Sequence, residues 1–208
     1  MPRLDLRDLR EPRALVVVFG AMAAQMAMGT TYARGPLTPA FVEELGWSRG
    51  DLMAAGSPGT WMTALASPVA GYLTQRYGAR PVITVGVLLT ALIGWGFSEL
   101  RSLWQLFALS IATGCMIASV GDVAVGSVVA KWVSAGRGLA LGIVYSGSNL
   151  GGSLFAMAAT LMLAPLGWRQ TYLILGLVSA AVLLPIVLST VREPRADFIP
   201  ASLAASNG

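Results

Sequence analysis

Long apolar stretches separated by short polar turns dominate this chain of 208 residues. Each stretch is long enough for a membrane-spanning helix, which needs roughly 20 mostly apolar residues. Because no water reaches the core of a bilayer, such segments must satisfy their own backbone groups, as helices do. The pattern therefore predicts an all-α membrane protein with six transmembrane helices, near residues 14–40, 50–74, 81–99, 103–131, 137–164 and 169–191.

The polar ends of the chain define the predicted domain organisation. Residues 1–13 form a cytoplasmic N-terminal segment, residues 14–191 the transmembrane domain, and residues 192–208 a polar tail that we expect to be disordered. A cleaved signal peptide is the alternative for the first stretch, since residues 21–23 (Ala-Met-Ala) resemble a cleavage site. We favour a retained helix because its apolar run exceeds the roughly 7–15 residues of a signal peptide.

Composition agrees with a membrane protein and excludes several kinds of chemistry. Hydrophobic residues make up 55% of the chain and charged residues only 12%. There is no histidine and only one cysteine, which excludes imidazole-based metal sites, histidine general bases and disulfide frameworks. We therefore expect no metal, no cofactor and no enzymatic activity. The net charge of +4 is explained by basic loops facing anionic lipid, so we expect no nucleic-acid partner.

Basic residues also predict the orientation. Those on one side of the six-span arrangement are Arg3, Arg7, Arg10, Arg13, Arg76, Arg80, Lys131, Arg137, Arg192 and Arg195, whereas Arg49, Arg101 and Arg169 lie on the other. The positive-inside rule then places both termini in the cytoplasm. The preference for arginine over lysine, with abundant alanine and glycine, suggests a GC-rich bacterial genome and hence a bacterial inner membrane.

Local signals predict where helices begin and where they are interrupted. Ser48 with Asp51, and Ser102 with Gln105, have the spacing of capping boxes. Prolines at positions 58 and 68 predict breaks in the second span, and the Gly-Pro pair at 35–36 predicts an interruption near the end of the first. Broken membrane helices favour a transporter over an inert anchor.

The turn between the second and third spans has a specific spacing, set by Gly71, Gln75, Arg76, Gly78 and Arg80. It resembles the signature loop Gly-x3-Asp-Arg-x-Gly-x-Arg-Arg/Lys of the major facilitator superfamily. Gln75 stands where that family has Asp, and a proline replaces the last basic residue. In that family the loop is a gating latch between helix bundles. The resemblance implies the same role here, with a charge network weakened by the loss of the Asp.

Three further regions resemble the monocarboxylate and oxalate/formate antiporter branch of that superfamily: residues 131–142, the glycine-rich segment 146–152, and the outer loops 46–49 and 167–169. Together they cover most of the chain in the family's order. The resemblance implies an N-terminal six-helix half with a 3+3 inverted repeat. It also implies secondary transport by alternating access, with small organic anions such as monocarboxylates as the substrate class.

The glycines of the fifth span predict close helix packing. Gly138 and Gly142, and Gly147 and Gly151, are each four residues apart and therefore share a helix face. A polar stripe with Tyr145 and Asn149 runs alongside. At the depth of Asn149 a polar side chain needs a partner, which is either another helix or a wet cavity.

Two charges fall within spans and are candidates for binding substrate or a coupling ion. Asp122 lies nine residues before Lys131, about 14 Å from that helix end. An intramembrane carboxylate is expensive and is by default a functional candidate, the alternative being a structural ion pair with Arg34, a loop arginine or a backbone donor. Arg34, next to Thr31, either attracts an anionic substrate or extends its charge towards the interface.

The leading hypothesis is a secondary transporter in half-length form. Its second half is either another copy, in a parallel two-fold homodimer, or a separate C-terminal partner chain. The alternatives are a truncated product and a membrane scaffold or regulator that kept the fold and lost transport. The expected partners are a small-molecule substrate and the lipid bilayer.

Overall fold

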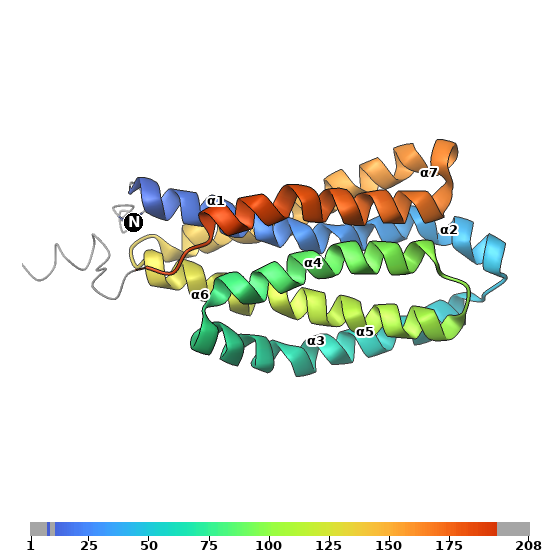
Figure 1. The fold of residues 1–208 in the computed structure, drawn as a ribbon, viewed down its shortest axis with the longest axis horizontal. Coiled ribbons are helices and arrows are strands. Elements are labelled where there is room, and N and C mark those ends of the chain that lie inside the picture. Colours follow the sequence, from blue (N-terminus) through green and yellow to red (C-terminus); the bar gives the residue numbers. More distant parts are fainter. Residues whose placement is uncertain (1–7, 9–10, 195–208) are drawn as a thin grey trace, which may run out of the picture.

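The computed structural model describes residue 8 and residues 11–194, and every regular element in that part of the chain is a helix. The helices lie side by side along the long axis of an elongated bundle (Figure 1). In chain order they are α1 (Pro12–Met26), the 3-10 helix η2 (Ala27–Ala33), α2 (Arg34–Leu45), α3 (Arg49–Tyr77), α4 (Ala79–Ser98), α5 (Leu103–Val120), α6 (Asp122–Trp132) and α7 (Arg137–Thr190). The predicted disordered tail, except residues 192–194, lies outside the described residues.

The first predicted span changes helix type in its middle. The hydroxyls of Thr30 and Thr31 donate to carbonyls three residues earlier, at 2.8 and 2.7 Å, within the 3-10 segment η2. Such local bonds compete with the α-helical pattern. The interruption predicted at residues 35–36 is wrong in position, because both lie inside α2. Pro36 falls in the first turn of α2, where proline is tolerated best.

The breaks predicted at Pro58 and Pro68 are also wrong, since both prolines lie inside the uninterrupted helix α3. The residue before each proline is a serine. Ser57 and Ser67 donate their hydroxyls to carbonyls one turn earlier, at 3.2 and 2.6 Å. These carbonyls, of Met53 and Thr63, are not the ones that the prolines free, which belong to Ala54 and Ala64. Membrane helices tolerate proline where neighbouring helices and small local adjustments satisfy such freed groups.

Both predicted capping boxes are confirmed at the starts of α3 and α5. The Asp51 amide donates to Ser48 Oγ at 3.1 Å, and the Ser48 amide donates to Asp51 Oδ2 at 2.9 Å. The same reciprocal bonds join Ser102 and Gln105, at 3.4 and 3.0 Å. Each box satisfies backbone donors that a helix start would otherwise leave without partners.

Two glycines shape the second half of the chain. At Gly121 the backbone is extended (φ −76°, ψ −175°), which separates α5 from α6. At Gly167 φ is +73°, a conformation that favours glycine, and here α7 turns back on itself. Figure 1 shows the two arms running in opposite directions along the bundle. Helix α1 touches both arms, through Gly147 in the first and Thr190 in the second.

Four helical stretches of the described chain are long and apolar enough to cross a membrane: Pro12–Leu45, Ala79–Ser98, Leu103–Trp132 and Arg137–Thr190. The last of these contains the turn at Gly167. Helix α3 does not count among them because it is less apolar than α4 or α5. The chain is an integral membrane protein, but six spans and a 3+3 repeat remain predictions.

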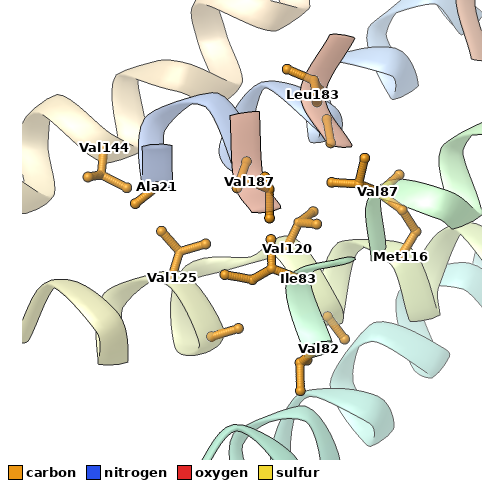
Figure 2. Packing of buried hydrophobic residues seen from close by; sticks show 14 of the residues in the cluster. Ala21, Val82, Ile83, Val87, Met116, Val120, Val125, Val144, Leu183 and Val187 are labelled. Carbon is orange, nitrogen blue, oxygen red and sulfur yellow. The ribbon is translucent and has the colours of Figure 1, made fainter. Parts of the chain in front are cut away.

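Helices approach most closely where small residues meet. A Cβ built on Gly29 would overlap the backbone of Gly151, and one on Gly94 would lie 2.8 Å from the Cα of Gly176. A Cβ on Gly59 would lie 2.7 Å from the carbonyl of Ser110. These contacts join η2 to the first arm of α7, α4 to its second arm, and α3 to α5. Aliphatic side chains such as Ile83, Val120 and Val187 fill the core around them (Figure 2).

At the end of the bundle opposite the start of α1, the carboxylate of Glu44 and the guanidinium of Arg169 connect three loops. Glu44 accepts hydrogen bonds from Trp168 Nε1 at 2.6 Å and Arg169 Nη2 at 2.9 Å. The Arg169 guanidinium also donates to the carbonyls of Ser98 and Leu100, at 3.0 and 2.8 Å. The end of α2, the α4–α5 loop and the turn of α7 are therefore held by one residue pair.

Candidate functional site

Asp122 lies at the break between α5 and α6, where Gly121 is the residue before α6. Gln25 on α1 donates its side-chain amide to Asp122 Oδ1 at 3.0 Å. Gln25 itself is buried, with 1% of its surface exposed, whereas Asp122 is exposed. As the first residue of α6, the carboxylate also lies at the positive end of that helix dipole. These two features fix the position of a carboxylate that the described chain leaves exposed.

Tyr145 is the second candidate placed at this break. Its hydroxyl donates to the backbone carbonyl of Asp122, a long bond at 3.4 Å, and lies 2.9 Å from a Cβ built on Gly126. A larger residue than glycine at position 126 would push the tyrosine away. Asn149, one turn further along α7, is exposed, and its side chain forms no hydrogen bond with the residues that the structure describes. The structure thus brings Tyr145, but not Asn149, to Asp122.

Arg34 and Thr31 form a separate group. Both line a cavity of about 60 Å³ between η2, α4, α5 and the second arm of α7, together with Phe97 and Tyr172. The Arg34 guanidinium carbon lies 5.3 Å from the centre of the Phe97 ring, which is 3% exposed. The charge therefore faces the inside of the bundle instead of extending to the interface. No ion pair between Arg34 and Asp122 is present.

The predicted gating loop joins α3 to α4 at the end of the bundle where α1 begins (Figure 1). Gly78 has φ +87° and starts α4. Arg76 donates to the Tyr72 hydroxyl at 2.7 Å, and Arg80 donates to the carbonyl of Leu188. Gln75 and Gly71 line a groove between α3 and α6.

An acidic residue does contact this loop, although it comes from the far end of α7. Glu193 accepts a hydrogen bond from the amide of Ala79 at 2.9 Å and pairs with Lys131 Nζ at 2.6 Å. It therefore caps α4 and joins it to the end of α6. The Trp132 indole donates to the carbonyl of Arg192 at 2.8 Å, which holds the same segment in place.

The glycines of α7 divide into two pairs. Gly147 lies against the carbonyl of Met22, and a Cβ on Gly151 would lie 2.6 Å from the carbonyl of Met26. Gly138 and Gly142 have no atom within 4 Å of a built Cβ. Gly147 and Gly151 therefore allow α7 to approach α1 closely. No described residue packs against Gly138 and Gly142, so their packing role stays a prediction.

Three residues at these sites were not singled out from the sequence: Gln25, Tyr172 and Glu193. Gln25 and Tyr172 are polar residues within apolar stretches, so the sequence alone could have indicated them as candidates. Glu193 lies in the polar tail, where only the fold reveals its partners. Among residue 8 and residues 11–194, no group of three Asp, Glu or Cys side chains could hold a metal ion.

Comparison with known proteins agrees with the predicted family. The sequence profile of the Major Facilitator Superfamily matches residues 15–205. Monocarboxylate transporter 11 of Homo sapiens is 36% identical over 143 residues, covering 62% of this chain and 30% of its own length. Monocarboxylate transporter 9 of Mus musculus is 24% identical over 176 residues, covering 81% of this chain and 33% of its own length. The MFS-type transporter pynF of Aspergillus niger is 27% identical over 194 residues, covering 92% of this chain and 44% of its own length.

The matches cover between 30% and 44% of the length of these relatives, all of which are named as transporters. The superfamily predicted from the loop at 71–80 is confirmed, and relatives of the predicted monocarboxylate branch are among the matches. This is a family of transporters and not of enzymes. On the match over residues 15–205, the chain belongs to the major facilitator superfamily.

Proposed function

We propose that this chain is one six-helix half of a secondary transporter for small organic anions, monocarboxylates among them. The names of its relatives support the substrate class. Transport would proceed by alternating access around a cavity between two such halves. The observation that carries the proposal is Asp122, an exposed carboxylate at a helix break, held by Gln25 and at the positive end of α6.

The glycine contacts support a 3+3 inverted repeat. Under such a repeat, the first three spans correspond in order to the last three. The contact of span one with span five (Gly29 with Gly151) then corresponds to that of span four with span two (Gly114 with Gly59). The contact of span three with span six (Gly94 with Gly176) corresponds to itself. Spans one and four are also the two that are irregular in the middle, at η2 and at Gly121.

We infer a second half because polar side chains within the predicted spans are exposed in the described chain. Asp122 and Asn149 are two of them. Polar side chains in the membrane need partners or a water-filled cavity. We propose that another copy, in a parallel homodimer, or a separate chain completes the cavity.

We further propose that both termini face the cytoplasm of a bacterial cell, across its inner membrane. The start of α1 and the end of α7 lie at the same end of the bundle, which fits an even number of crossings (Figure 1). The basic residues Arg76, Arg80, Lys131 and Arg137 gather at that end. Clusters of this kind mark the cytoplasmic side of membrane proteins.

Uptake into proteoliposomes tests the proposal. Vesicles containing the purified chain should take up or exchange a labelled monocarboxylate, and Asp122→Asn should remove the dependence of that uptake on pH. Asn149→Ala should reduce uptake without changing the pH dependence. Folded wild-type protein that transports no small carboxylate would instead favour the alternative, a truncated or non-transporting scaffold or regulator.

A further inference from the structure

The small cavity beside Arg34 has unusual chemistry for a space inside a helix bundle. Its volume is about 60 Å³, and its lining is mostly apolar except for four threonines, Arg34 and Tyr172. A space of this size holds a few water molecules or one small ion, since a water needs only about 10–15 Å³ by this measure. It is well below the roughly 300 Å³ of a site for a drug-sized ligand.

Two polar groups in the cavity, the Arg34 guanidinium and the Tyr172 hydroxyl, lie next to each other, and neither has an acidic partner in the described chain. Arg34 forms no ion pair with any residue of the described chain. The Tyr172 side chain is 6% exposed. Its hydroxyl oxygen faces the Arg34 guanidinium, which can only donate, so the hydrogen of the hydroxyl has no acceptor among the described residues. Both residues contact Phe97, since the tyrosine ring stacks on it with ring centres 4.4 Å apart. A half-buried charge without a counter-ion and a buried hydroxyl without an acceptor both cost free energy.

The remaining hydroxyls of the cavity have already used their hydrogens. Each of the four threonines donates to a carbonyl of its own helix: Thr30 to Ala27, Thr31 to Met28, Thr90 to Val87 and Thr113 to Leu109. Arg34 and Tyr172 are therefore the side chains of this cavity with hydrogens left to donate. An acceptor that also carries a negative charge would satisfy both of them, whereas water would leave the guanidinium charge uncompensated.

We propose that this cavity binds a small monovalent anion between the Arg34 guanidinium and the Tyr172 hydroxyl. The volume limits the anion to a halide or to the carboxylate group of a one- or two-carbon acid. Arg34 also lines a second, wider groove of about 330 Å³ between α2, α3 and α5, which includes Ser57 and Thr60. An anion that enters from this groove would therefore meet the Arg34 guanidinium before it reaches the Tyr172 hydroxyl in the cavity. A role of this anion in transport rests on the proposed function, but its binding does not.

Equilibrium binding of radiolabelled chloride and formate to the purified 208-residue chain tests the site, with sodium gluconate keeping the ionic strength constant. Wild-type protein should bind chloride saturably, at one site per chain. Arg34→Gln should weaken binding more than about tenfold, since it removes the charge, and Tyr172→Phe about three- to tenfold. Arg49→Gln and Tyr32→Phe are matched controls outside the cavity and should leave the affinity unchanged.

Competition by formate would identify a carboxylate as a ligand, whereas chloride binding without competition would identify a halide site; either supports the proposal. Absence of saturable binding would overturn it, as would binding that Tyr172→Phe and Arg34→Gln leave unchanged. If Arg34→Gln fails to fold, Arg34→Lys is the substitute because it keeps the charge. Its chloride affinity should stay within about tenfold of wild type. Binding without uptake would contradict the proposed transport function alone, and uptake without binding would contradict this inference alone.

Discussion

The side-chain amide of Gln25 donates a hydrogen bond of 3.0 Å to the carboxylate of Asp122, joining α1 to the first residue of α6. Gln25 is neutral, so this bond orients the carboxylate without neutralising it. No cation of the described chain forms an ion pair with Asp122. The carboxylate is therefore positioned by the fold while one side of it stays exposed in the described chain.

Gln25→Leu should destabilise the folded protein because it removes this bond from a buried position. We expect a loss of about 1–2 kcal/mol in unfolding free energy, since the bond reaches a charged but exposed acceptor. Thermal unfolding in detergent measures the change. Gln170→Leu is the matched control, because Gln170 is exposed and should give a change within about 0.5 kcal/mol. Equal effects of the two substitutions would show that the bond with Asp122 contributes nothing.

The glycines of α7 provide a second prediction within one helix. Gly147→Ala should destabilise the protein by about 1–3 kcal/mol, because the added Cβ would overlap the carbonyl of Met22. Gly142→Ala should be neutral or stabilising by up to about 1 kcal/mol, because nothing lies near it and alanine favours a helix. Thermal unfolding of both variants under the same conditions makes the comparison. A destabilising Gly142→Ala would reveal a partner surface over that glycine.

Glu193→Gln should loosen the start of α4. The substitution removes the charge that pairs with Lys131, and this pair is partly exposed, at 40% and 34% of the two side chains. The ion pair itself contributes about 0.2–1 kcal/mol, so the change in overall stability should be small. Hydrogen exchange is the sharper measurement: the Ala79 amide should exchange faster in Glu193→Ala, which lacks any acceptor, than in Glu193→Gln. Equal exchange in wild type and Glu193→Ala would contradict the capping role.

Glu44→Gln should weaken the connection among the three loops at the other end of the bundle. Its carboxylate accepts from both Trp168 and Arg169, and an amide can keep only part of that arrangement. We expect a loss of about 1 kcal/mol, discounted because Glu44 is half exposed. The adjacent Glu43→Gln is the control, since Glu43 is exposed and forms no ion pair with the described residues. A loss of equal size in both variants would argue against the contact.

Several features of this fold could be predicted from local sequence because local chemistry determines them. Ser48 and Ser102 begin helices in the predicted way, since a capping box needs only residues three positions apart. The superfamily could be predicted from the spacing of the loop at 71–80 for the same reason. By contrast, Pro58 and Pro68 do not break α3. Whether a membrane helix continues through a proline depends on its packing against neighbouring helices, which the positions of the prolines do not reveal.

The candidate sites depend on residues far apart in the chain, and this limited their prediction. Asp122 could be singled out as an intramembrane charge, but its partner Gln25 is 97 positions away. Likewise, nothing near Arg34 in the sequence indicates that Phe97 and Tyr172 would surround it. The Asp missing at position 75 suggested a weakened loop, yet Glu193 supplies an acidic contact there from the end of the chain.

The glycine contacts between α3 and α5, between η2 and α7, and between α4 and α7 also bear on how this unit could move. At each of them backbone lies against backbone, so there is no flexible side chain that could change its rotamer to let one helix slide past another. Sliding or rolling within the bundle would break several contacts at once. On the proposed function, a large motion during transport would therefore move this bundle as one rigid body.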